Sequence, residues 1–281
     1  MIDKKTIIKA AFVLLALSGM CLSCKLAQNS AGLQPEKPDA NSVETVLKQL
    51  SRKTEELESY SSRIEYLFSQ PSFESETLRK GVLHYASFGK ESKLRINFET
   101  LKQDDEKQQK CVEHYIFDGV WLTRIDYQLE QVTMRQLTEP NEPVDAFELL
   151  SRNFPIVGFS KIEDLEKQFD IELVKQKAEE ANSVIPAKAG IHEFIHLHLK
   201  VKPDSIYKDD YTSIDFWVDR KLWLPTKMIA VSTEPAEDEQ KDIYQIRFLR
   251  PKINKKISKK TFDIKIPKGF TVEKNPLKKK D

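Results

Sequence analysis

Cysteine and glycine are scarce in this chain, and net charge is almost absent. Three cysteines in 281 residues, two of them within the first 24, cannot build a disulfide framework, so an apolar core must stabilise the fold. Eight glycines, with neither a GxxxxGKS/T loop nor a GxGxxG turn, give no support to a nucleotide enzyme. The 45 Lys and Arg against 44 Asp and Glu also lack the cationic excess that favours nucleic acid binding.

The first 24 residues read as a signal peptide. Lys4, Lys5 and Lys9 precede the apolar run 10–17 and the small residues that follow it. The uncharged stretch is short for the ~30 Å of a bilayer core, so we expect cleavage and a periplasmic location. Cys24 follows Leu-Ser, as at the end of a lipoprotein signal, and its lipidation as a membrane anchor stays open.

Residues 25–40 are polar, contain two prolines and show no periodicity, which is typical of a linker. From Asn41 apolar residues recur at helical spacing up to Leu57, and Asn41 with Glu44 forms a plausible capping box. This pattern predicts an amphipathic helix of roughly five turns.

The apolar period then changes from 3.6 to 2, most clearly where Leu94, Ile96 and Phe98 alternate with charged and polar residues. Tight hairpins are expected at 88–91, at Asp118-Gly119 and at 219–221. Further strands are expected at 129–137, 168–177, 193–201, 241–250 and 262–266. The pattern predicts an antiparallel meander of about ten or eleven strands, long enough to curl.

Two helical patches, Val144–Leu150 and Lys161–Phe169, interrupt the meander on either side of the apolar segment 154–159. With the first helix they can cover one side of the sheet. The expected fold is therefore α+β and mainly antiparallel β, an unclosed curled barrel with helices on its concave face. We assign one domain to residues 41–274, followed by a basic tail at 275–281.

The order of these elements is similar to that of the LolA-type lipoprotein carriers of the LolA, LolB and LppX-like superfamily. The resemblance rests on the helix that enters the meander and on the segments YIFDGVWLTRIDYQLEQVTMRQL, PVDAFELLSRNF, DFWVDRKLWLPTKM and IKIPKGFTVE, and it runs from about Ser42 to Glu273. It implies an unclosed barrel with a helical lid and an apolar cavity. It also implies transient binding of the acyl chains of lipoproteins or lipids in transit to the outer membrane.

A carrier of acyl chains needs a large apolar lining, since each buried CH₂ contributes ~0.8 kcal/mol. It needs no catalytic residue, metal or cofactor, so we expect a binding protein rather than an enzyme, and a monomer. The candidate lining residues lie on the apolar side of the alternating strands, where ordinary core packing gives the same pattern: Ile64, Tyr66, Phe68, Leu94, Ile96, Phe98, Ile214, Phe216, Ile246 and Phe248.

Two further groups of residues follow from the carrier hypothesis. The family resemblance implies a polar residue, often arginine, that pins the lid, and Arg63, Arg79 and Arg95 on the first strands are the candidates. It also implies an inner-membrane extraction complex and an outer-membrane acceptor as partners. Trp121, Trp217 and Trp223 lie near hairpin turns, where they either pack or face a membrane or partner.

The rival hypothesis is a zinc peptidase, because His192-Glu193-Phe194-Ile195-His196 is a literal HExxH. The context argues against it. Residues 195–201 alternate with the period of a strand, which separates His192 and His196 by about 13 Å. His196 and His198, about 7 Å apart, share a metal only with distortion.

Residues 183–192, SVIPAKAGIH, resemble a peptide that arises when a dispersed DNA repeat inserts into a bacterial gene, so His192 and Glu193 are interpreted as part of a passenger loop. A third hypothesis is an envelope assembly module without a ligand cavity, suggested by the basic segments 252–260 and 278–280. Lysines at exposed strand edges explain the same segments, because they prevent mispairing.

Overall fold

The computed structural model describes residues 42–89, 91–140, 146, 162–174, 194–233 and 240–277. The expected signal peptide, the linker, most of Val144–Leu150, the proposed insertion and Lys278–Lys280 lie outside these residues. Within the described ranges, no helix is both long and apolar enough to cross a bilayer.

Helix α2 (Val43–Glu55) is amphipathic as expected, but it is shorter than the sequence suggested. Its N-cap is Ser42 rather than Asn41: the hydroxyl of Ser42 accepts a hydrogen bond from the backbone N–H of Thr45 at 3.2 Å. Its 13 residues make fewer than four turns, not five, because the chain leaves the helix before Leu57 and enters the first strand. Val46, Leu47 and Leu50 form its buried face.

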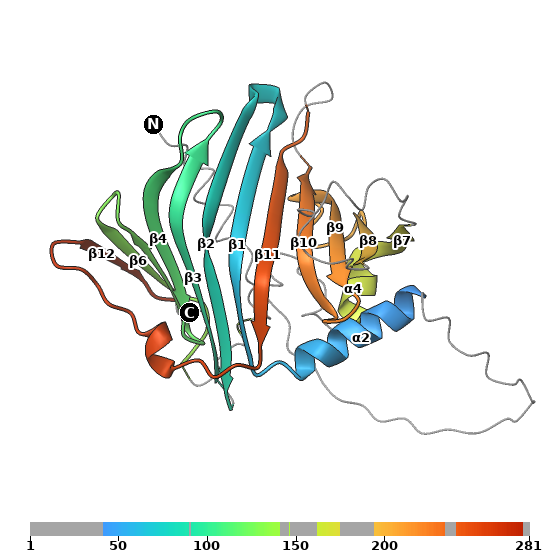
Figure 1. Cartoon of the computed structure of the whole chain (residues 1–281), viewed down its shortest axis with the longest axis horizontal. Coiled ribbons are helices and arrows are strands. Elements are labelled where there is room, and N and C mark those ends of the chain that lie inside the picture. Colours follow the sequence, from blue (N-terminus) through green and yellow to red (C-terminus); the bar gives the residue numbers. More distant parts are fainter. Residues whose placement is uncertain are drawn as a thin grey trace, which may run out of the picture.

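Twelve strands form one sheet among the described residues, so the expected ten or eleven is slightly low. The order across the sheet is β12-β6-β5-β4-β3-β2-β1-β11-β10-β9-β8-β7 (Figure 1). The strands are β1 (Ser59–Gln70), β2 (Ser75–Phe88), β3 (Glu91–Gln103), β4 (Gln109–Phe117), β5 (Trp121–Asp126), β6 (Gln131–Gln136), β7 (Phe169–Val174), β8 (Phe194–Val201), β9 (Tyr211–Asp219), β10 (Leu224–Ser232), β11 (Ile243–Ile253) and β12 (Thr271–Asn275).

The predicted hairpins are confirmed, and an aspartate side chain stabilises two of them in the same way. Asp118 Oδ1 accepts hydrogen bonds from the backbone N–H groups of Val120 and Trp121 between β4 and β5. Asp219 Oδ1 does the same for Lys221 and Leu222 between β9 and β10. An aspartate at the start of a turn thus satisfies backbone donors that the strands leave unpaired.

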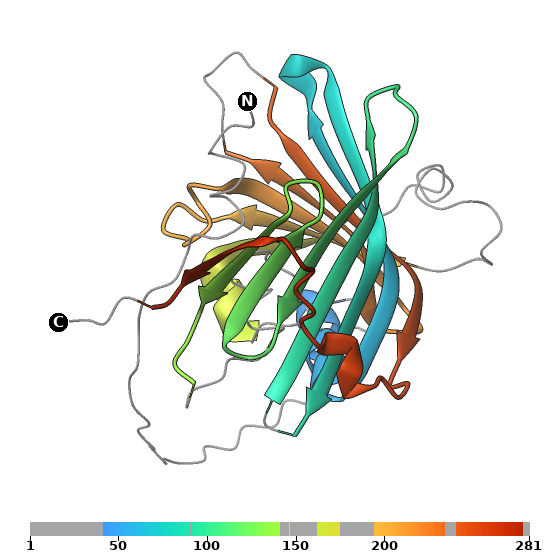
Figure 2. The same cartoon turned by 90° about the vertical axis from the view of Figure 1, so that its left-hand side faces the viewer.

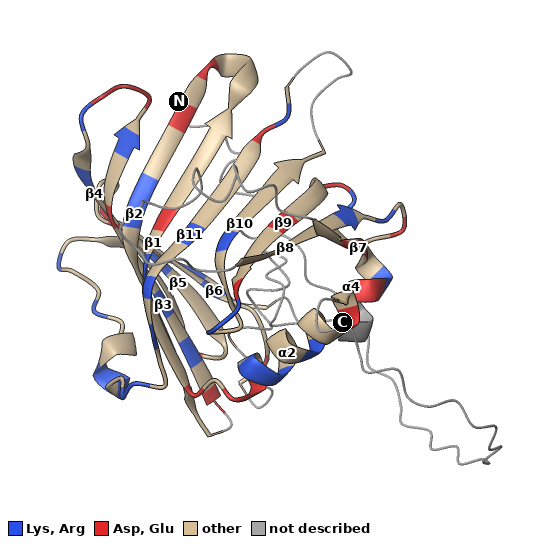
Figure 3. Ribbon diagram, turned by 45° about the vertical axis from the view of Figure 1, so that its right-hand side comes forward, with Lys and Arg blue, Asp and Glu red and all other residues tan. Residues whose placement is uncertain are grey.

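The sheet curls around one apolar cluster. Leu83 and Phe117 from one half of the sheet and Leu197 and Leu199 from the other belong to the same buried cluster, which also contains Leu50 of α2. A flat sheet would keep these strands far apart. The face that carries the cluster is therefore concave, and Figure 3 shows α2 and α4 (Ile162–Gln168) next to each other at the open side of the curl.

The C-terminal end differs from the expected meander. Residues 262–266 do not form a strand: the chain makes a short 3-10 helix, η3 (Lys259–Phe262), and then runs extended to β12. β12 pairs with β6 in parallel, not antiparallel. We call residues 254–277 the C-terminal strap, because they cross the outer, convex face of the sheet (Figure 2).

The strap covers a second, smaller apolar cluster, which explains the alternation at 262–266 without a strand. Ile116, Ile125 and Val132 are buried on the convex face, and Ile264 and Phe270 of the strap pack over them. Phe262 is buried and Ile264 packs on this cluster, whereas Ile266 is 44% exposed. The first two apolar residues of the alternation thus pack against a sheet that they do not extend at that point.

Candidate functional site

The strand register places all ten candidate lining residues on the concave face. Ile64 lies opposite Phe248 on β11 and opposite Gly81 on β2, which in turn lies opposite Phe98 on β3. The remaining pairings continue the same face through β10 to β9, where Phe216 lies opposite Met228. Cross-strand partners point to the same side of a sheet, so the predicted side of each strand is confirmed.

Burial divides these ten residues into two groups. Ile64, Leu94, Ile214 and Phe216 have exposed fractions of 4% or less and belong to the central core. The other six are only partly buried, and they stay predicted lining residues: Tyr66, Phe68, Ile96, Phe98, Ile246 and Phe248.

Three aromatic rings run across the partly buried part of the concave face. The ring centroids of Tyr66 and Phe98 are 6.3 Å apart, and Phe98 makes an edge contact with Tyr115 of β4, also at 6.3 Å. Tyr66 belongs to β1 and Phe98 to β3, so the contact spans the strand between them. Glycine at position 81 of β2 makes this possible, since it places no side chain between the two rings.

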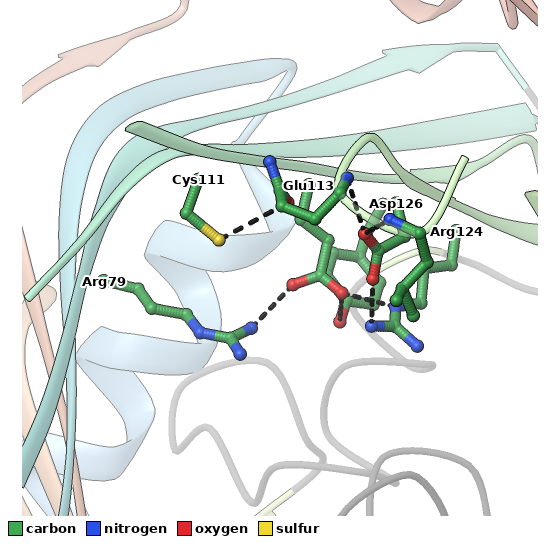
Figure 4. Close-up of polar contacts among 8 residues, drawn as sticks. Arg79, Cys111, Glu113, Arg124 and Asp126 are labelled. Atoms are coloured by element: carbon green, nitrogen blue, oxygen red, sulfur yellow. Dashed lines mark hydrogen bonds and ion pairs between the residues drawn. The ribbon is translucent and has the colours of Figure 1, made fainter. Parts of the chain in front are cut away.

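This row of rings leads to a cluster of charged side chains that sequence reasoning missed. Glu113 precedes Tyr115 and Phe117 at the spacing of one strand face, and Arg124 on β5 lies directly opposite Tyr115. Arg79 on β2 joins them from the other side. Figure 4 shows Arg79 and Arg124 approaching the carboxylate of Glu113 from opposite sides. We call Arg79, Glu113, Arg124 and Asp126 the charged cluster.

Glu113 is the centre of the charged cluster. Its side chain is only 4% exposed, and Arg79 Nη1 donates to its Oε2 at 2.6 Å. Arg124 Nε and the hydroxyl of Tyr115 donate to its Oε1, and Arg124 Nη2 donates to Asp126 Oδ2 at 2.9 Å. A buried carboxylate is tolerated because all these donors compensate its lost hydration.

The pKa values of Arg124 and Tyr115 keep this guanidinium charged and this phenol protonated. Burial, and then the negative charge of Glu113, raises the pKa of Tyr115, so its hydroxyl remains a donor. Burial alone would lower the pKa of Arg124, but Tyr115, Glu113 and Asp126 raise it. Burial raises the pKa of Tyr66 to about 12, against the effect of Arg79.

The three strand arginines proposed as lid-pinning residues lie in different places. Arg63 is exposed on the convex face, opposite Val82. Arg79 is part of the charged cluster. Arg95 is on the convex face, where its Nη1 donates to the carbonyl oxygens of Thr261 and Asp263, each at 3.1 Å. Arg95 therefore holds the C-terminal strap, while its role toward a helical lid stays a prediction.

Two histidines flank Arg95 on the convex face, and we expect them to make this region sensitive to acid. His84 lies opposite Arg95, and His114 Nδ1 is 3.2 Å from Arg95 Nη2. Burial, then Arg95, lowers the pKa of both, with Lys252 adding to the effect on His84. A histidine whose pKa is lowered by folding contributes its full stability above the pKa of the unfolded state, about 6.5. This contribution is lost as the pH falls from that value toward the pKa of the folded state.

We expect the urea midpoint of the wild-type protein to decrease when the pH is lowered from about 7.5 to about 5.5. The urea midpoint of the double variant His84→Gln, His114→Gln should decrease less over the same interval. Asp263 and Tyr127 also face Arg95, and the variant retains both. Unfolding followed by tryptophan fluorescence at the two pH values measures the difference. Equal losses in both proteins would contradict the assignment to these histidines.

The residues of the HExxH segment that the structure describes are on a strand, not a helix. His196 and His198 belong to β8 on the convex face, and both approach Asp215 Oδ1, at 2.7 and 3.0 Å. Burial would raise the pKa of Asp215, but these two hydrogen bonds lower it. His192 and Glu193 lie outside the described residues. No group of three His, Cys, Asp or Glu suited to a metal occurs in the described part of the chain.

The three tryptophans are partly buried and have protein partners. Trp217 lies between the imidazole of His196, with ring centroids 4.3 Å apart, and the ammonium of Lys227, 4.4 Å from the ring. Trp121 is covered by Lys274 of the strap at 4.6 Å. Trp223 packs against the central core. Packing is thus what the structure describes for all three, and a membrane-facing role stays a prediction.

Comparisons with known proteins identify similar architectures but no family by sequence. No family model matches the chain, and no curated protein matches it. An uncharacterized conserved protein from Thermus thermophilus has a TM-score of 0.46 and 8% identity, over 83% of this chain and 98% of the other. The Pseudomonas aeruginosa MucA/MucB complex matches with a TM-score of 0.41 and 11% identity, over 78% of this chain and 60% of the other.

A LolA superfamily protein from Nitrosomonas europaea is also similar, with a TM-score of 0.30 and 12% identity, over 78% of this chain and 97% of the other. A member of the family indicated by the sequence is thus among the similar structures. Similarities with TM-scores of 0.30 to 0.46 concern architecture and show no functional property of this chain.

Proposed function

We propose that this protein binds the acyl chains of lipids or lipoproteins against its concave face, as a periplasmic carrier or acceptor for transfer toward the outer membrane. The observation that carries the proposal is the row of partly buried apolar side chains on that face. Tyr66, Phe98 and Ile246 are hydrophobic, they face the inside of the curl, and they retain accessible surface.

The sheet is suited to such a ligand because its two faces differ. The concave face presents aromatic and aliphatic side chains along β1, β3 and β11, while the smaller apolar cluster of the convex face is covered by the C-terminal strap. A large contiguous patch of accessible apolar side chains on a folded protein marks a binding site, whereas scattered apolar residues do not. Each methylene of an acyl chain buried there contributes about 0.8 kcal/mol.

Replacing Phe98 by alanine tests the proposal. Phe98 contacts both Tyr66 and Tyr115, so its removal deletes the centre of the apolar surface. We expect the affinity for a fluorescent fatty acid, measured by titration, to fall about tenfold or more, since a buried aromatic ring contributes on the order of 2 kcal/mol. Phe270→Ala is the matched control, because Phe270 packs on the convex face.

Three results would contradict the proposal: no uptake of the fatty acid by the wild-type protein, equal losses in Phe98→Ala and Phe270→Ala, or no loss in either. A complementary measurement is native mass spectrometry of protein purified from its own periplasmic and membrane fractions, with organic extraction of the ligand. Acylated cargo that leaves on extraction supports the carrier function. A mass that corresponds to a mature chain beginning at a diacylated Cys24 would identify a membrane-anchored acceptor.

A further inference from the structure

The charged cluster presents cations, not anions, to the space above the concave face. The side chains of Arg79 and Arg124 are 32% and 29% exposed. Those of Glu113 and Asp126, which they bind, are only 4% and 12% exposed. The buried carboxylates therefore balance the positive charge of the arginines, while the accessible edge of the cluster consists of guanidinium groups.

Arg79 has spare hydrogen-bonding capacity. Among the described residues its bond to Glu113 uses Nη1 alone, and a guanidinium has five N–H donors in a planar fork. Such a fork suits the paired oxygens of a phosphate or carboxylate. The carboxylate of Glu113 holds one edge of the fork in place, which reduces the entropy lost when an anion binds to the rest.

The charged cluster lies next to the apolar surface rather than apart from it. Arg79 is the cross-strand partner of Tyr66 on one side and of Leu101 on the other, and Glu113 is the partner of Phe98. A ligand whose chain lies along Tyr66 and Phe98 therefore has its polar end within the reach of Arg79. The concave face thus combines an apolar surface with a cationic border.

We propose that Arg79 and Arg124 bind the anionic headgroup of an amphiphile whose acyl chain occupies the concave face. This inference rests on the proposed function and narrows its ligand class: a lipid with a phosphate or carboxylate next to its chain is preferred over a neutral acyl glycerol. Glu113 is a positioning residue for the two arginines, because its buried carboxylate is withdrawn from the ligand.

The test compares two probes that differ only in the headgroup: 1-oleoylglycerol 3-phosphate, which is anionic, and 1-oleoylglycerol, which is neutral. We expect the wild-type protein to bind the phosphate probe about tenfold more tightly, the value of one or two charge-assisted hydrogen bonds. In Arg79→Gln most of that preference should be lost, because Arg124 alone then faces the headgroup, while the affinity for 1-oleoylglycerol stays the same. Arg63→Gln is the control, since it makes the same substitution on the convex face of β1.

Each outcome separates the inference from the function on which it rests. Equal affinity of the wild-type protein for both probes overturns the headgroup site and leaves acyl binding intact. Binding of neither probe overturns both. Glycerol 3-phosphate is the third ligand: if it binds as tightly as the acylated phosphate, the charged cluster is a site for free anions and the lipid assignment is wrong.

A second measurement applies if Arg79→Gln does not fold. Salt screens the attraction between the arginines and a headgroup but not the burial of the chain. Raising the ionic strength should therefore reduce the preference of the wild-type protein for the phosphate probe and leave 1-oleoylglycerol unaffected. A preference that does not change with salt would contradict a charge-based headgroup site.

Discussion

Replacing Gly81 by alanine is expected to lower the free energy of unfolding by about 3 kcal/mol, at the upper end of what overpacking costs. A Cβ atom at position 81 would lie 2.0 Å from the carbonyl oxygen of Asn97 and 2.9 Å from the Cα of Phe98. Both contacts are with the backbone of β3, which cannot rotate away as a side chain can. The pairing of β2 with β3 must therefore shift at this point.

Gly89 is the matched control for Gly81. It lies in the β2–β3 connection with φ at +82°, and nothing lies within 4 Å of an added Cβ. Gly89→Ala meets only the backbone strain of a left-handed conformation, about 1 to 2 kcal/mol. Urea unfolding of the two variants and the wild-type protein measures the difference. Equal costs would show that β3 moves easily at Asn97.

The second large effect is expected at Glu113. Glu113→Leu leaves the guanidinium groups of Arg79 and Arg124 without their shared carboxylate, and it removes an acceptor from the hydroxyl of Tyr115. Breaking a buried ion pair costs about 3 to 5 kcal/mol. Because both arginines keep some contact with water, we expect the lower value, about 3 kcal/mol.

Glu65 gives a control with the same charges on the other face of the sheet. It also bridges two cations, Lys80 and Arg247, each at 3.3 Å, but its side chain is 22% exposed. Glu65→Leu should therefore cost about 1 kcal/mol or less. The midpoints of urea denaturation of Glu113→Leu and Glu65→Leu measure the difference between the two losses of stability. If the two variants lose the same stability, burial is not what makes Glu113 important.

The sequence was sufficient to predict the side of each strand, because alternation is a local signal. Leu94, Ile96 and Phe98 alternate with polar residues, and the structure places them on the concave face. The charged cluster could have been suspected from the same signal, since Glu113 shares its strand face with Tyr115 and Phe117. What the sequence did not contain is the partner: Arg79 reaches Glu113 only because the register of β2, β3 and β4 brings them together.

The wrong predictions likewise concern features that depend on contacts between segments far apart in the chain. The alternation of 262–266 predicted a strand, yet Phe262 and Ile264 bury their side chains without pairing their backbone. The parallel pairing of β12 with β6 joins segments more than a hundred residues apart, and no local pattern specifies it. Asn41 and Ser42 are both good N-caps, so the choice between them depends on where α2 meets the core.

The pairing of β1 with β11 determines the order in which this chain can fold. These two strands lie side by side in the middle of the sheet, although about 180 residues separate Tyr66 from its partner Ile246. Strands β1 to β6 can pair as soon as they are synthesised, but their β1 edge has no neighbour until β11 exists. During that interval the growing protein carries an open strand edge beside Tyr66 and Phe68, and such edges promote aggregation. The pairing of β1 with β11 is a step of high contact order, and we expect it to limit the rate of folding.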